Sequence, residues 1–126
     1  PDNTAVPQEL LDLIAPVYNG LKNKTNRNEE ENAGYKLVRL IMEQPHIPDA
    51  DLQKISCPSL VIGGDHDVIK VEHTLEIFNN IPKAYLWILP GSGHSTPIKY
   101  ADEFNKKIEE FFKKPYRKFE IDQRLF

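Results

Sequence analysis

Two short apolar runs, separated by a segment of helical periodicity, constrain the fold of this chain more than any other feature. The first run, at residues 59–63, follows a proline, and the second, at residues 84–89, precedes a Pro-Gly pair. Short continuous apolar runs that are bounded by Gly and Pro are typical of strands buried on both faces. The sequence therefore predicts two interior strands.

The segment between these runs, residues 71–80, carries Val71, Leu75 and Phe78 at spacings of three and four, which predicts a helix. Two buried strands joined by a helix form a βαβ unit, whose strands are parallel and whose crossover is right-handed. Such a unit normally belongs to a larger sheet that is covered on both faces. The predicted fold class is therefore α/β.

Helical periodicity is also found on both sides of the βαβ unit. Before it, a helix is predicted from Pro7, with a kink or a break at Pro16 because proline removes a backbone hydrogen bond. A second helix is predicted to end at Pro45, and a short turn at residues 49–54. The expected inward positions are Leu10, Leu13, Ile14, Val17 and Leu21 in the first helix, Leu37, Val38, Leu40, Ile41 and Met42 in the second, and Phe104, Ile108, Phe111 and Phe112 in a final helix at residues 100–114.

Composition limits the expected partners and the expected location. The 126 residues include 16 basic and 19 acidic side chains, mostly interspersed, and the net charge of −3 makes nucleic acid an unlikely partner class. No apolar run approaches the roughly 18 residues that span a bilayer, and the first seven residues lack a secretion signal pattern. We expect a cytoplasmic protein without a membrane span, whose natural N-terminus is missing here. The single cysteine, Cys57, is expected to be packed.

Acidic and imidazole side chains follow both predicted strands. Asp65, His66 and Asp67 come after the first strand, and His94 comes after the second. In an open parallel sheet, catalytic groups and ligands lie beyond the carboxyl ends of the strands, and neighbouring strands are about 5 Å apart. Asp67 and His94 can therefore share a hydrogen bond, in which the carboxylate fixes the imidazole tautomer and stabilises the imidazolium. The alternative is that Asp67 caps the next helix and that His94 is a surface loop residue.

Residues 52–112 resemble the C-terminal part of the α/β-hydrolase family. The resemblance is carried by Leu52-Gln53-Lys54-Ile55-Ser56-Cys57-Pro58, Gly64-Asp65-His66-Asp67, Ile81-Pro82-Lys83-Ala84, Pro90-Gly91-Ser92-Gly93-His94 and Phe104. In that family the catalytic acid ends a Gly-x-x-Asp pattern, which implies Asp67 rather than Asp65, and the base after the next strand would be His94. The family order places the nucleophile before the acid and the base.

The nucleophile of that family is absent from the 126 residues. They contain no Gly-x-Ser-x-Gly elbow and no His-Gly oxyanion segment before it. Ser92 lies in a loop beside His94, whereas an elbow serine lies on a strained turn from strand to helix. Lys70, Lys99 and Ala101 also depart from the family pattern, at positions that shape helix starts and leave the chemistry untouched.

The resemblance further implies a division of the chain into three parts. Residues 1–48 would be the end of the cap, the helical insertion that covers the active site and shapes the substrate pocket. Residues 49–114 would be the C-terminal βαβα part of the hydrolase core, and residues 115–126 a tail without a clear period.

The leading hypothesis is therefore a part of a serine hydrolase that acts on an ester, thioester, lactone or small peptide bond, without a cofactor. The chain alone is expected to be inactive and to self-associate through the edge of its first strand. The alternative is a non-catalytic α/β-hydrolase-like binding or interaction module. A metal site is a weaker rival, and its candidate ligands are His46, Asp65, His66, Asp67, His73 and His94. Otherwise Asp65 and His66 are expected to be solvated loop residues.

Overall fold

The structure, a computed structural model, describes residues 5–43 and 46–120. Its elements in chain order are α1 (Gln8–Lys22), α2 (Glu29–Glu43), α3 (Asp49–Leu52), β1 (Ser59–Gly64), α4 (Val71–Asn80), β2 (Ala84–Leu89), α5 (Thr96–Lys99) and α6 (Ala101–Lys113). Among the residues it describes, no helix has the length and apolar character needed to cross a bilayer.

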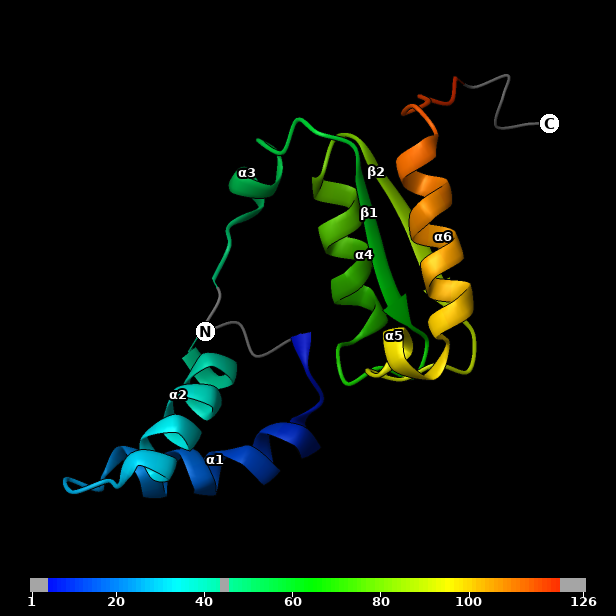
Figure 1. Ribbon diagram of the computed structural model, residues 1–126. Coiled ribbons are helices and arrows are strands. Elements are labelled where there is room, and N and C mark those ends of the chain that lie inside the picture. Colours follow the sequence, from blue (N-terminus) through cyan, green and yellow to red (C-terminus); the bar gives the residue numbers. More distant parts are fainter. Residues whose placement is uncertain (1–4, 44–45, 121–126) are drawn as a thin grey trace.

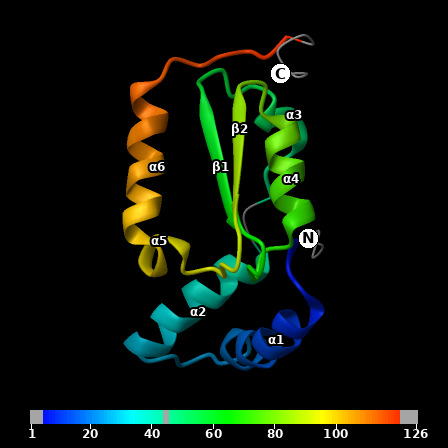
Figure 2. The same cartoon turned by 90° about the vertical axis from the view of Figure 1, so that its right-hand side faces the viewer.

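The centre of the fold is a parallel pair of strands between two helices. β1 and β2 pair in a register that places Ser59 opposite Ala84 and Gly64 opposite Leu89. Figures 1 and 2 show α4 on one face of this sheet and α6 on the other. The α6 layer contacts β2 through aromatic side chains, with ring centroids 6.3 Å apart for Trp87 and Phe104. The predicted α/β class and βαβ unit are confirmed.

The burial of the strands differs from the prediction. Gly64 and Leu89, at the ends of the two strands, are buried, whereas the other strand residues are half-buried. The described sheet has two strands, so each strand has one edge without a neighbouring strand. Apolar side chains that a wider sheet would cover are therefore partly open to solvent.

Helices α1 and α2 form a helical hairpin that projects from the α/β layers (Figure 1). Leu11 and Tyr18 of α1 are buried, and the Tyr18 ring stacks on Tyr35 of α2 at a centroid distance of 6.2 Å. The Tyr18 hydroxyl donates a hydrogen bond to Glu43 at the end of α2. A backbone hydrogen bond of 2.8 Å from Lys70 N to the Ala5 carbonyl links the start of the hairpin to the segment before α4.

Several predictions about inward side chains are wrong. In α1, Leu11 and Tyr18 share one face with Ile14 and Leu21, at spacings of three and four, and Tyr18 of this face stacks on Tyr35 of α2. The large apolar side chains predicted to face inward but found exposed are Leu13, Val17, Leu37, Leu40, Ile41 and Phe112, the last at 78%. Cys57 is also exposed rather than packed.

Two local features of the helices also differ from the prediction. α1 continues through Pro16, so the predicted break is absent. Proline removes only one backbone hydrogen bond, and the other turns of the helix keep their hydrogen bonds. The short helix α5, which carries Pro97 in its first turn, was not predicted because four residues are too few to show a period. The final helix begins at Ala101 and ends at Lys113, close to its predicted bounds.

The start of α2 provides a test of the hairpin. Glu31 N donates to Asn28 Oδ1 at 2.8 Å and Asn28 N donates to Glu31 Oε2 at 3.0 Å, which together form a capping box. We expect Asn28→Ala to lower the free energy of unfolding by about 1 kcal/mol, measured by urea denaturation with circular dichroism. Asn26→Ala, at an exposed position of the preceding loop, is the matched control. Equal losses in both variants would contradict the capping role.

Candidate active site

The predicted site residues lie in two loops at one edge of the sheet. Gly64 and Leu89 end their strands opposite each other, so the segments that follow begin side by side. We call residues 65–70 the acid loop and residues 90–95 the histidine loop. Figure 2 shows both strands ending beside α5, at the end of the sheet that faces the α1/α2 hairpin.

Asp67 and His94 are in hydrogen-bond contact. His94 Nδ1 lies 2.9 Å from Asp67 Oδ1, and the same carboxylate oxygen accepts a hydrogen bond from Ile69 N at 3.0 Å. The side chain of Asp67 is 13% exposed and that of His94 is 68% exposed. The predicted proximity is confirmed, and a molecule arriving from solvent can reach the imidazole. Their catalytic roles remain a prediction.

The surroundings of Asp67 determine its ionisation. Burial of the carboxyl raises its pKa, but hydrogen bonds from Ile69 N, His94 and Gly64 N outweigh that effect and leave the pKa below its usual value. The carboxylate is therefore ionised at neutral pH and can only accept hydrogen bonds, so His94 Nδ1 must be the donor. A neutral His94 then carries its lone pair on Nε2, as a general base requires.

The alternative role for Asp67, as the cap of the following helix, is not observed. Lys70 occupies the N-cap position of α4, and no side chain there makes a capping hydrogen bond. The carboxylate of Asp67 instead closes a local turn with Ile69 N. The same carboxylate oxygen also contacts His94 in the neighbouring loop.

Asp65 was expected to be a solvated loop residue, and its side chain is exposed, at 36%, but it also makes specific contacts with the histidine loop. Its Oδ1 accepts a hydrogen bond from Ser92 N at 3.1 Å and lies 2.8 Å from His66 Nδ1. The contacts with His66 and with backbone N–H groups of the histidine loop, Gly91 and Ser92, lower the pKa of Asp65 to about 2. His66 itself is 77% exposed, as expected.

The two loops are also joined through their backbones. Asp65 N donates to the Leu89 carbonyl at 3.2 Å, and His66 N donates to the Ser92 carbonyl at 2.9 Å. Gly64 is required at this junction because a Cβ at its position would lie 2.1 Å from the Ser92 oxygen. In the histidine loop, Gly91 adopts a left-handed backbone conformation, with φ of +65°.

Ser92 is a residue of the site that sequence reasoning did not identify. It is fully buried, and its hydroxyl lies 2.6 Å from that of Thr96, which donates to the Gly93 carbonyl at 2.9 Å. Its place between two glycines marked it as part of a tight loop. No local pattern indicates its bond to Asp65, which is 27 positions away along the chain.

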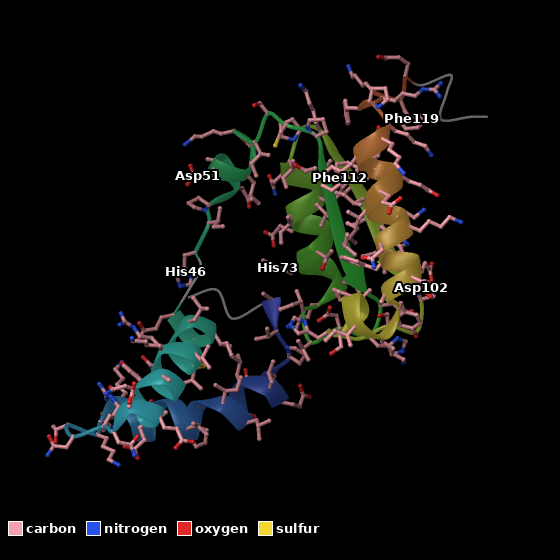
Figure 3. The ribbon with its side chains drawn as sticks, viewed as in Figure 1. His46, Asp51, His73, Asp102, Phe112 and Phe119 are labelled. Atoms are coloured by element: carbon pink, nitrogen blue, oxygen red, sulfur yellow. The ribbon has the colours of Figure 1, made fainter. Side chains whose placement is uncertain are left out.

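The six candidate metal ligands do not form one site: Asp65 pairs with His66 and Asp67 with His94, and the other two lie elsewhere. Figure 3 shows His46 in the segment between α2 and α3, away from His73 on α4. The ring of His73 lies 3.1 Å from Glu76 of the same helix. In residues 5–43 and 46–120, no group of three or more His, Cys, Asp or Glu side chains is arranged to hold a metal ion.

A cavity of about 630 Å³ lies at the opposite end of the sheet from the two loops. Tyr85 at the start of β2 contributes to it, whereas His94 follows the end of the same strand. The cavity is lined by Tyr85, Lys107, Glu110, Phe111, Lys114, Pro115, Tyr116, Arg117 and Phe119. It therefore does not include the Asp67–His94 pair.

The close approach at Gly64 leads to a prediction with an internal control. We expect Gly64→Ala to destabilise the protein because its Cβ cannot be accommodated against the backbone of Ser92. Gly20→Ala, in α1 with no atom within 4 Å of the added Cβ, should instead stabilise it by roughly 0.5–1 kcal/mol through helix propensity. Urea denaturation of both variants measures the difference. A neutral Gly64→Ala would show that the two loops are further apart than described.

No protein-family model matches the chain. The chain is similar to serine hydrolase BPHL from Homo sapiens, with 26% identity over 81% of this chain and 42% of the relative. Serine hydrolase BPHL from Mus musculus is 28% identical over 48% of this chain and 21% of its own length. The chain thus spans less than half the length of the curated relatives that it matches.

Solved structures of similar fold cover most of the chain. A serine hydrolase involved in carbazole degradation, CarC, superposes with a TM-score of 0.58 at 20% identity, covering 67% of this chain and 33% of that one. An α/β fold family hydrolase from Bacillus anthracis gives a TM-score of 0.58 at 20% identity, covering 80% of this chain and 48% of that one. An α/β hydrolase from the metagenome of lagoon sediments in Morocco gives a TM-score of 0.58 at 23% identity, covering 83% of this chain and 44% of that one. The chain therefore has part of the α/β-hydrolase fold, as the resemblance implied.

Proposed function

We propose that this chain supplies the acid and the base of a Ser-Asp-His triad in a serine hydrolase. The observation that carries the proposal is the 2.9 Å contact between Asp67 and His94 at the carboxyl edge of a parallel sheet. The similarity to a human serine hydrolase supports it. A binding module without catalysis would not require this contact. The nucleophilic serine would lie outside these 126 residues, which lack the elbow motif.

The proposed reaction is acyl transfer in two steps. The serine hydroxyl gives its proton to His94 Nε2 while its oxygen attacks the acyl carbon, and the Asp67 carboxylate stabilises the imidazolium that forms. His94 then protonates the leaving group, which departs and leaves an acyl-enzyme. Water hydrolyses the acyl-enzyme with the same base. The proposed substrates are esters, thioesters, lactones or small peptides.

The three-part division of the chain is also part of the proposal. Residues 49–114 would be hydrolase core, residues 1–48 would be cap, and residues 115–126 a tail. The position of the α1/α2 hairpin supports the cap assignment, because the hairpin lies at the end of the sheet that carries both loops (Figure 2). The exposed apolar side chains of this hairpin, Leu13, Val17, Leu37, Leu40 and Ile41, would suit the lining of a pocket for an apolar substrate.

Substitution of the pair tests the proposal in a longer protein that combines this chain with an upstream elbow serine. His94→Ala should remove most esterase activity because the general base is lost, and Asp67→Asn should lower kcat by roughly 10⁴ because the wrong tautomer is favoured. Hydrolysis of p-nitrophenyl esters measures both effects. His73→Ala, on α4 and paired with Glu76, is the control. Full activity in His94→Ala would end the proposal.

The isolated chain is expected to be inactive and to form a dimer. One edge of β1 has no strand neighbour in the part of the chain that the structure describes. Such an edge, beside half-buried apolar side chains, favours pairing with another chain. The dimer would form by antiparallel pairing of the β1 edges or by exchange of the N-terminal helices. Light scattering at micromolar concentration measures the mass, and a clean monomer would contradict the expectation.

A further inference from the structure

We propose that Asp65 is a positioning residue that fastens the histidine loop to the acid loop and thereby holds His94 against Asp67. That this positioning serves catalysis by His94 rests on the proposed function. The contacts themselves do not, since they are geometric features of the chain. The two carboxylates of the acid loop thus have distinct roles. Asp67 contacts His94, and Asp65 places the histidine loop.

Asp65 is bonded to β2 and to the histidine loop at the same time. Its backbone N donates to the carbonyl of Leu89, the last residue of β2, at 3.2 Å. Its side chain accepts the N–H of Ser92, three residues further along, at 3.1 Å. These two bonds from one residue fix both where the histidine loop leaves the strand and the direction in which it turns.

The histidine loop is held on both sides of His94. Before His94, Ser92 is fully buried and its carbonyl accepts the N–H of His66 at 2.9 Å. After it, the hydroxyl of Thr96 contacts the Ser92 hydroxyl at 2.6 Å and donates to the Gly93 carbonyl at 2.9 Å. The backbone flanking the imidazole therefore has little freedom, and the ring is presented to the acid loop.

Asp67 does not depend on this arrangement for its own placement. Its carboxylate is fixed within the acid loop by Ile69 N at 3.0 Å. Loss of the Asp65 side chain should therefore release the histidine loop while leaving the acid in place. The Asp65–His66 contact is not expected to contribute much, because His66 is 77% exposed and an ion pair in water is weak. Among the contacts of the Asp65 side chain, the hydrogen bond from Ser92 N is therefore the one that holds the histidine loop.

Nuclear magnetic resonance of the 126-residue chain tests the proposal through two signals. The ¹⁵N shifts of the His94 ring report the Nδ1–H tautomer that Asp67 selects, and hydrogen exchange of the Ser92 amide reports its bond to Asp65. In Asp65→Ala, the ring shifts should move toward an average of both tautomers, and Ser92 exchange should accelerate by about tenfold or more because the buried amide loses its acceptor. Asp65→Asn keeps an oxygen acceptor and should restore both signals.

His66→Ala is the matched control, because it removes the exposed partner of Asp65 and keeps the bond to Ser92. It should leave both signals unchanged. Thr96→Val, which removes the hydroxyl at nearly constant volume, loosens the loop from its other side and should shift the His94 ring signals even if Asp65→Ala does not fold. Unchanged His94 and Ser92 signals in Asp65→Ala would overturn the proposal, and so would the loss of both signals in His66→Ala.

Kinetics of the longer protein separate this inference from the proposed function. There, Asp65→Ala should lower kcat with little change in KM, and Asp65→Asn should recover most of the loss. If His94→Ala proved fully active, the proposed function would fail, while the ring signals of the isolated chain would still decide whether Asp65 positions His94.

Discussion

The parallel pairing of β1 with β2 is the interaction on which the remaining structure depends. Its register places the ends of both strands side by side, which brings together loops that are 27 positions apart in the sequence. α4 exists as the crossover that parallel pairing requires, and it covers one face of the sheet. The contact between Asp67 and His94 follows from this topology, because the two loops that carry them leave the sheet at the same edge.

The elements that sequence reasoning predicted well are those with strong local signals. α4 and β2 have their predicted bounds, since the period changes sharply and proline or glycine marks the ends of β2. The Asp67–His94 contact could also be predicted, because parallel strands end at the same edge of a sheet. Both conclusions needed only the order of elements and the general rules of strand pairing.

Features that depend on partner surfaces could not be predicted in this way. Leu13 was placed inward and Leu11 was not, although both are leucines of one helix, and the structure buries Leu11 and exposes Leu13. Periodicity alone does not show which of the apolar residues of a helix will meet another element. The bond from Ser92 to Asp65 depends on a backbone approach that glycine at position 64 permits. Local periodicity carries no information about such an approach, and the bond between Ser92 and the exposed carboxylate of Asp65 was therefore not predicted.

The unequal exposure of the acid and the base has a consequence for the strength of their attraction. The side chain of Asp67 is largely buried, whereas the imidazole of His94 lies mostly in water. The Coulomb energy between a carboxylate and an imidazolium is about four times larger at an effective dielectric constant of 20 than in bulk water. The local chain thus orients the pair, and in the proposed hydrolase the shielding of His94 from water would come from a surface that closes over it.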